Sequence, residues 1–140
     1  MARPSGPKVR CGGRWTEAKF TDFVKNQIRS GTRKWAPIHD CFNNAVVDRH
    51  NFRCDGCKEI KPKTIINDKR KRVKNYAIDH IKPIIDPAVG FVDWNSFIEN
   101  SFCELDNLQT LCLDCHYNKT KEESSIAKDR RAKEKGRQDA

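Results

Sequence analysis

The sequence predicts a mixed α+β fold of modest size that is held together by a metal. Apolar residues recur at helical spacing in the first third of the chain. Short alternating stretches, separated by prolines and basic runs, follow and predict strands. Two Cys-x-x-Cys pairs frame those strands. Such pairs are typical of a structural metal site, which a chain this polar needs in addition to a small core.

Composition limits the classes of protein to consider. The chain has 140 residues, of which 34% are charged and 36% hydrophobic, and its formal net charge is +9. This length suits one domain, and the charge favours a polyanionic partner, with nucleic acid ahead of an anionic membrane surface. No apolar run is long enough to cross a membrane, and the N-terminus lacks the apolar stretch of a secretory signal. We therefore expect a cytoplasmic protein.

The N-terminal part is expected to be helical after a disordered start. Residues 1–13 are basic and rich in Pro and Gly, which predicts disorder, and residues 14–51 predict a helical segment. Its first helix has a plausible N-cap at Thr16 and a stop signal at Gly31. A second helix is expected to begin near Pro37.

Residues 52–126 are predicted to form a compact core. Its first feature is a Cys-x-x-Cys turn between two short strands. Further along we expect a strand at "NYAIDHI", a loop over residues 82–92, a short helix capped at Asp93, a strand at "NLQTLC", and a helix from about Asp114. Residues 127–140 are predicted to be a charged tail.

The two cysteine pairs predict one structural zinc site. Each two-residue spacer lets two thiolates converge on one ion, and two such turns complete a tetrahedral shell. The predicted ligands are Cys54, Cys57, Cys112 and Cys115. Cys41 and Cys103 have no partner at this spacing and are expected to be small buried hydrophobes.

The stretch "CLDCH", residues 112–116, also matches the pattern to which c-type haem is attached. Haem attachment and disulfide frameworks belong to exported compartments, and seven cysteines cannot all pair in disulfides. A haem site would leave the first cysteine pair unexplained. We therefore expect zinc and no haem, with a c-type cytochrome or thiol redox protein as a remote alternative.

Asp79-His80, Asn107 and His116 follow one another along the chain in the order of a known nuclease motif. "AIDHIKPI" contains Asp79 and His80, and "NLQTLCLDCHYNKT" contains Asn107 and His116. This order resembles the HNH nuclease family over roughly residues 52–122, including its zinc-knuckle form with two Cys-x-x-Cys pairs. The resemblance implies a ββα-metal (His-Me finger) core stapled by zinc and preceded by a helical segment. The start of that segment, "RWTEAKF", is similar to small HNH proteins encoded by bacteriophages.

The resemblance implies a metal-dependent endonuclease that hydrolyses DNA by nicking, double-strand cleavage or both, leaving 5′-phosphate and 3′-hydroxyl ends. It would act in a bacterial host cytoplasm, with phage packaging or recombination proteins as conceivable partners. A monomer with one site would most simply nick, and a weak dimer is the alternative.

The residue chemistry agrees with that implication. Phosphodiester hydrolysis requires a base that activates water and a cation that stabilises the developing charge. An imidazole accepts protons near neutral pH, so His80 is the expected base. Asp79 and His116 are expected to hold one divalent cation, Mg²⁺ or Mn²⁺ by the carboxylate, with Ni²⁺, Co²⁺ or Zn²⁺ also admitted by the histidine. By the resemblance, Asn107 is no ligand but ties the loop after His80 to the next strand.

One position departs from the family pattern. Some HNH enzymes carry a further histidine four residues after the helix histidine, and here that residue is Thr120. A third protein ligand is therefore not expected at that position. The plainer interpretation is that Asp79-His80 caps a turn and His116 caps a helix, within a non-catalytic zinc-stapled module that binds nucleic acid.

Positive charge is concentrated in residues 61–74, between the first cysteine pair and the strand with His80. The DNA contacts expected there are Lys69, Arg70, Lys71 and Arg72, with Lys119 and Lys121 on the last helix as further candidates. Contacts of this kind position a duplex and carry no base information. A solvated loop or a nuclear-localisation look-alike is the alternative interpretation of this segment.

Overall fold

The computed structural model describes residues 6–138, which form two compact units that divide after Lys34. Residues 1–5, at the start of the segment expected to be disordered, lie outside the described residues. None of the helices in the described part of the chain is both long and apolar enough to cross a membrane.

The described part of the first unit consists of a turn, one α-helix and the short 3₁₀ helix η1 (Thr32–Lys34). The backbones of Arg10 and Trp15 exchange hydrogen bonds of 3.1 Å across the turn, and the Arg10 guanidinium pairs with Glu17 at 2.8 Å. Helix α1 (Glu17–Gly31) begins as predicted, because the Thr16 hydroxyl accepts a hydrogen bond from the Lys19 amide. No residue of α1 is buried.

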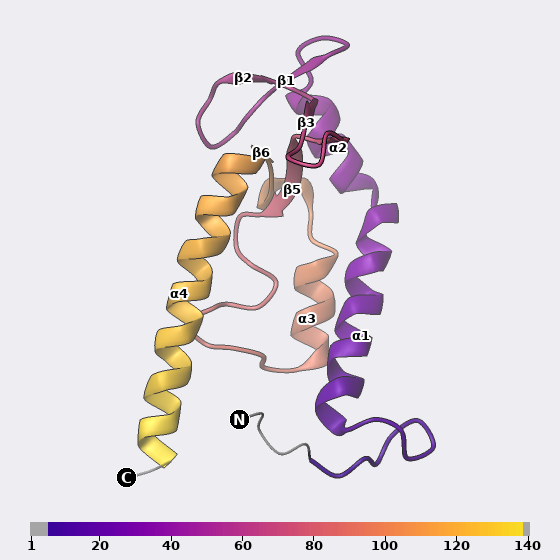
Figure 1. Cartoon of the computed structure of the whole chain (residues 1–140), viewed down its shortest axis with the longest axis vertical. Coiled ribbons are helices and arrows are strands. Elements are labelled where there is room, and N and C mark those ends of the chain that lie inside the picture. Colours follow the sequence, from indigo (N-terminus) through magenta and orange to yellow (C-terminus); the bar gives the residue numbers. More distant parts are fainter. Residues whose placement is uncertain (1–5, 139–140) are drawn as a thin grey trace. The chain divides into compact units, whose positions relative to one another are not determined.

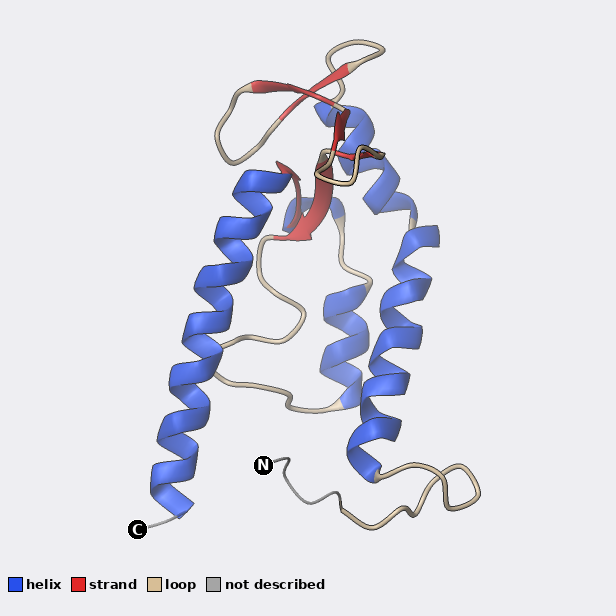
Figure 2. Ribbon diagram, in the orientation of Figure 1, coloured by secondary structure: helices blue, strands red, loops and turns tan. Residues whose placement is uncertain are grey.

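The second unit holds the remaining elements, shown in Figure 1 and Figure 2. They are, in chain order, α2 (Ala36–Ala45), β1 (Asn51–Arg53), β2 (Ile60–Pro62), β3 (Thr64–Ile66), β4 (Arg72–Lys74), β5 (Tyr76–His80), α3 (Trp94–Ser101), β6 (Leu108–Cys112) and α4 (Leu113–Gln138). The strands form three two-stranded antiparallel sheets, β1–β2, β3–β4 and β5–β6. The predicted α+β class is therefore confirmed.

Helix α2 belongs to this second unit, although the sequence had grouped it with α1. The Cys41 side chain, buried on α2, lies 3.4 Å from the Thr110 hydroxyl on β6. The boundary between units therefore falls after Lys34 and not before Phe52.

The core of the second unit lies where α2, the β1–β2 turn and β6 meet. Its buried residues are Phe52, Cys54, Leu111 and Cys112. The ring of Phe42 stacks on that of Tyr76 at 4.1 Å beside them. Because Phe52 is fully buried, its truncation to Ala should cost about 3–5 kcal/mol of stability.

The last elements run strand, loop, helix, strand, helix. Strand β5 pairs with β6 from Tyr76↔Cys112 to His80↔Leu108. Between them, α3 begins as predicted at Asp93, whose carboxylate accepts a 2.7 Å hydrogen bond from the Ser96 amide. Helix α4 follows β6 directly and continues to Gln138, so most of the predicted tail is helical.

Candidate metal centre and active site

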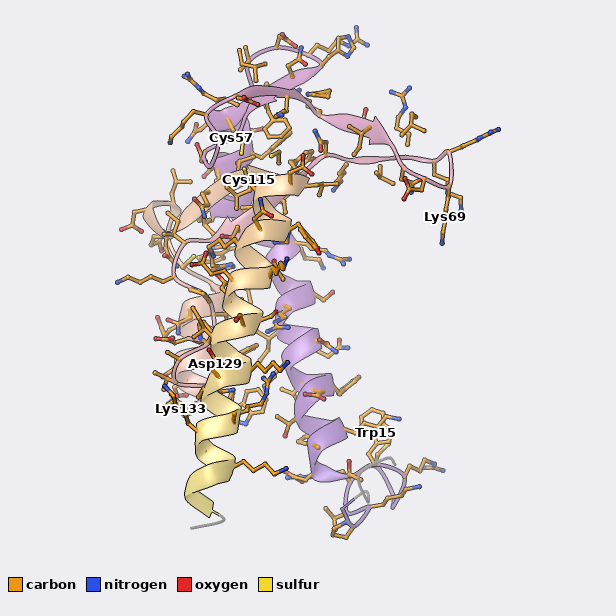
Figure 3. The ribbon with its side chains drawn as sticks, turned by 60° about the vertical axis from the view of Figure 1, so that its left-hand side comes forward. Trp15, Cys57, Lys69, Cys115, Asp129 and Lys133 are labelled. Atoms are coloured by element: carbon orange, nitrogen blue, oxygen red, sulfur yellow. The ribbon has the colours of Figure 1, made fainter. Side chains whose placement is uncertain are left out.

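Four cysteines from two separate turns meet at one point. Cys54 and Cys57 lie in the turn between β1 and β2, Cys112 ends β6, and Cys115 lies in the first turn of α4. Their sulfur atoms all lie within 4.8 Å of one another, and Figure 3 shows Cys57 of the β1–β2 turn near Cys115, which lies at the start of α4. The predicted four-cysteine cluster is therefore present.

The geometry of this cluster fits a tetrahedral ion. Zn–S bonds of about 2.3 Å place the sulfurs of a tetrahedral shell about 3.8 Å apart, which is within the observed spacing. In addition, the Cys112 amide donates a hydrogen bond of 3.2 Å to the Cys54 sulfur. The four cysteines could therefore hold a metal ion, and the donor set is consistent with structural zinc.

The thiols of the cluster differ in acidity. Burial raises the pKa of Cys54, but hydrogen bonds from the amides of Cys112, Cys57 and Gly56 outweigh it and lower that pKa to about 7. Burial, with hydrogen bonds to the neighbouring sulfurs, raises the pKa of Cys115 to about 12. A bound cation would remove this asymmetry, because it favours the thiolate at every position.

Asp55 ties the first cysteine turn to β6 through its backbone and its side chain. The Asp55 amide donates to the Thr110 carbonyl at 2.8 Å, and the Asp55 carboxylate accepts from the Thr110 amide at 2.7 Å. Gly56 lies so close to α4 that an added Cβ would stand 3.1 Å from the Cys115 sulfur. A side chain at position 56 would therefore push the two turns apart.

His80 lies at the end of β5, and its ring orientation is set by a backbone carbonyl. The Nε2 atom of His80 lies 3.1 Å from the carbonyl oxygen of Ser101, the last residue of α3. A carbonyl oxygen only accepts, so Nε2 must carry the hydrogen and Nδ1 is left with the lone pair. In the neutral form of the imidazole, Nδ1 is then the nitrogen that can accept a proton.

Asn107 forms hydrogen bonds with the two residues that follow His80. Its side-chain oxygen accepts from the Lys82 amide at 2.9 Å, and its side-chain nitrogen donates to the Lys82 carbonyl at 3.3 Å. Its backbone carbonyl accepts from the Ile81 amide at 2.9 Å. Three contacts from one residue therefore tie the loop after β5 to the start of β6.

Asp79 is held between an amide and an ammonium. Its Oδ2 atom accepts from Gln109 Nε2 at 3.0 Å, across the β5–β6 pair, and lies 2.8 Å from the Lys119 nitrogen on α4. The Asp79 side chain is 14% exposed and that of Lys119 is 23% exposed. Asp79 is therefore fixed in place by both neighbouring elements.

The Lys119 ammonium has two more acceptors. It donates to the His80 carbonyl at 3.0 Å and to the Glu123 carboxylate at 2.5 Å. Burial lowers the pKa of Lys119, but the hydrogen bonds to Asp79 and Glu123 outweigh this and raise it above its ordinary value. Lys119 was predicted to contact DNA, yet here its charge is directed inward, and a phosphate contact would require it to leave these partners.

His116 lies half-buried one turn before Lys119 on α4. Residues three and seven positions apart share a helix face, so His116, Lys119 and Glu123 line one side of α4. Within the described residues, the only group of three or more close metal-binding side chains is the four-cysteine cluster. The structure therefore does not gather Asp79, His116 and a third such side chain into one group.

A cleft opens beside these residues. Its volume is about 700 Å³, and Asn107, Lys119 and Glu123 line it together with Lys82 and Asn100. Lys121 is exposed on the next face of α4, and Thr120 is exposed as well. Asn107, Lys119 and Glu123 therefore border one hollow, whereas Asp79, His80 and His116 are not among the residues that line it.

The basic segment forms a hairpin rather than a loop. Strands β3 and β4 pair from Thr64↔Lys74 to Ile66↔Arg72. The Asn67 side chain accepts from the amides of Lys69 and Lys71 in the connecting turn, and Figure 3 shows Lys69 at its outer end. Residues 68–72 are exposed. The hairpin thus presents Lys69, Arg70, Lys71 and Arg72 to solvent.

Several contributors to this site were not found from the sequence. Ser101 acts through a backbone atom, which residue type does not reveal, while Gln109 and Glu123 follow only from strand register and helix spacing.

Cys41 is buried as predicted, whereas Cys103 is only half-buried. No protein-family model, curated protein or solved structure matches this chain.

Proposed function

We propose that this protein is a metal-dependent endonuclease of the HNH type that hydrolyses phosphodiester bonds in DNA. The observation that carries the proposal is the 3.1 Å contact between His80 Nε2 and the Ser101 carbonyl oxygen, from which we infer that Nε2 carries the hydrogen. This contact leaves Nδ1 as the proton acceptor of the neutral ring, on the residue that follows Asp79 and directly precedes the segment bound by Asn107, which suits general-base hydrolysis.

In the proposed reaction, His80 Nδ1 takes a proton from a water molecule. The water oxygen forms a bond to phosphorus, the bond from phosphorus to the 3′ oxygen breaks, and the departing oxygen takes a proton from solvent. The products are a 5′-phosphate and a 3′-hydroxyl, and the imidazolium then releases its proton to solvent.

Asp79 and His116 are the residues that would hold the divalent cation. A cation bound there supplies positive charge to the scissile phosphate and the leaving oxygen. The fit is supported by the convergence of the Asp79 carboxylate and the His80 carbonyl on one positively charged nitrogen atom, that of Lys119. Oxygen donors of this kind suit Mg²⁺ or Mn²⁺.

Zinc in the four-cysteine cluster would have a structural role. The cluster joins the end of β6 and the start of α4 to the β1–β2 turn. It therefore fixes the strand that follows Asn107 and the helix that carries His116, without contributing a ligand to the hydrolytic site.

DNA would be held mainly by its phosphates. The hairpin of β3 and β4 presents four exposed cations at its turn, and a two-stranded ribbon has dimensions that fit a duplex groove. On α4, the exposed Lys121 directly precedes Glu122, which lines the cleft. Such contacts position the substrate and leave its sequence unread.

Plasmid relaxation tests this proposal. Zinc-loaded protein should convert supercoiled DNA to nicked or linear DNA with Mg²⁺ or Mn²⁺, and DNA ligase should reseal the nicks because they carry 5′-phosphate and 3′-hydroxyl ends. Supercoiled DNA that stays intact with every divalent cation would leave a zinc-stapled binding module as the better description.

A further inference from the structure

The Lys119 ammonium occupies a site built of oxygen atoms from two different elements. Its nitrogen lies 2.8 Å from Asp79 Oδ2, 3.0 Å from the His80 carbonyl oxygen and 2.5 Å from Glu123 Oε1. An ammonium has three hydrogens, so each has its own acceptor. The side chains involved are between 14% and 29% exposed.

This set of acceptors is also a set of divalent-cation ligands. Mg²⁺ and Mn²⁺ prefer carboxylate and carbonyl oxygens, and two carboxylates here face a single positive charge. An ammonium and a divalent cation cannot share these oxygens, because two like charges a few ångströms apart repel strongly in a partly desolvated site.

We propose that Lys119 is a place-holder cation and that Glu123 is a further ligand of the divalent cation. In the metal-free protein Lys119 neutralises the oxygens of Asp79, His80 and Glu123, and it is displaced when a divalent cation binds them. The proposal deepens the metal site of the proposed function, on which it rests, but it does not depend on cleavage of DNA.

Glu123 adds a second carboxylate to the Asp79 and His80 oxygens around the Lys119 nitrogen. It lies two turns after His116 on the same face of α4, whereas Thr120 between them is exposed. Asp79 and Glu123 would therefore contribute carboxylates, and His80 a carbonyl oxygen, on one side of the cation. Lys119 in turn sets the affinity of the site, because a cation must compete with it.

The test is Mn²⁺ binding by the full-length, zinc-loaded chain, measured by electron paramagnetic resonance of free Mn²⁺. Lys119→Met removes the charge and keeps most of the side-chain length, and Lys128→Met removes one exposed charge elsewhere on α4 as its matched control. Glu123→Gln removes the proposed ligand, and Glu122→Gln is the control at an exposed neighbour.

Lys119→Met should bind Mn²⁺ about tenfold more tightly than the parent, because the opposing charge is gone, while Lys128→Met should change little. Glu123→Gln should bind about tenfold more weakly, because a carboxylate ligand becomes a neutral amide, while Glu122→Gln should match the parent. Zinc content and circular dichroism report folding of each variant. If Lys119→Met does not fold, the Glu123→Gln and Glu122→Gln pair decides.

Three results overturn the inference: Lys119→Met binding no more tightly than Lys128→Met, Glu123→Gln equal to Glu122→Gln, or no Mn²⁺ bound by any variant. DNA cleavage separates this inference from the proposed function. If the Mn²⁺ affinities change as expected but no DNA is cleaved, the cation site is supported and the nuclease function is rejected. If DNA is cleaved but neither Lys119→Met nor Glu123→Gln changes the Mn²⁺ affinity, the nuclease function is supported and the role of Lys119 as a place-holder is rejected.

Discussion

The Nε2 atom of His80 lies 3.1 Å from the carbonyl oxygen of Ser101, so the end of helix α3 determines which nitrogen of the imidazole is basic. Ser101 is fully buried, and its hydroxyl donates to the Phe97 carbonyl at 2.6 Å. The acceptor for His80 is therefore part of a rigid helix end. Changes that loosen α3 should affect His80 although they lie outside the cleft.

Asp93 offers one such change. Hydrogen bonds from Ser96 hold the pKa of the capping Asp93 carboxyl below its ordinary value of 3.8. A lowered folded-state pKa stabilises the protein above pH 3.8, and this contribution is lost as pH falls through the folded value. Asp93→Ala should therefore lower Tm by a few degrees at neutral pH, and the difference from the parent should shrink below about pH 4.

Thermal melts of both proteins at matched pH values measure this difference. Asp93→Asn is the control, because Asn is an equally good cap that does not titrate in this range. A Tm difference between the parent and Asp93→Ala that stays constant down to pH 3 would mean that the capping carboxylate does not stabilise α3.

Zinc should be present at about one ion per chain and should be needed for folding. Cys54→Ser or Cys112→Ser should unfold or aggregate the protein, because each residue is buried in the core and is also a predicted zinc ligand. Cys11→Ser is the matched control, since Cys11 is exposed and lies in the first unit. Elemental analysis that finds folded protein without zinc would contradict the structural role of the cluster.

Affinity for duplex DNA should fall steeply as salt rises, with a slope that corresponds to roughly 4–7 phosphate contacts. Replacing Lys69, Arg70, Lys71 and Arg72 by Gln should flatten the slope, because these exposed side chains stand at the hairpin turn. Fluorescence anisotropy at several salt concentrations measures this. Binding that does not respond to salt would argue against phosphate contacts altogether.

Asn107→Ala should reduce the cleavage rate by about 10–100-fold with little change in KM, because the loop after His80 loses both side-chain contacts to Lys82. Asn107→Asp keeps an acceptor for the Lys82 amide and loses only the donor, so its rate should lie between those of the parent and Asn107→Ala. Steady-state kinetics on a labelled duplex compares the three. Equal rates would mean that the clamp does not orient His80.

Local signals explain what the sequence predicted well. The caps at Thr16 and Asp93 are both present, because N-cap chemistry depends on residues only two or three positions apart. The cysteine spacing likewise predicted that four sulfurs would meet, because each two-residue turn constrains its own pair. Such features need no knowledge of the rest of the chain.

The basic hairpin was missed because its charge concealed its pattern. Ile65 and Val73 are half-buried opposite each other while their neighbours are exposed, which is the alternation of a strand pair. The turn contains no glycine, and Arg70 adopts the left-handed conformation, with φ at 59°. Without the usual turn residues, a run of Lys and Arg indicates only a solvated segment.

The direction of the Lys119 side chain could not be predicted either. Its carboxylate partners lie on the same helix and on a strand far earlier in the chain, and only the packing of α4 beside β5 brings them together. A lysine next to a predicted active site suggests a phosphate contact, whereas the structure pairs it with acids. The same limit applies to Gln109, which meets Asp79 only through the register of β5 and β6.

The most direct test of a hydrolytic role for this site is the cleavage rate of His80→Ala relative to the parent, with zinc content and DNA affinity measured in parallel. Loss of the base should slow cleavage by roughly 10²–10⁴-fold, and added Mn²⁺ or Mg²⁺ should not restore it, while zinc and DNA affinity stay unchanged. His50→Ala, at an exposed histidine, should cleave like the parent. A His80→Ala protein that cleaves as fast as the parent would contradict the nuclease mechanism.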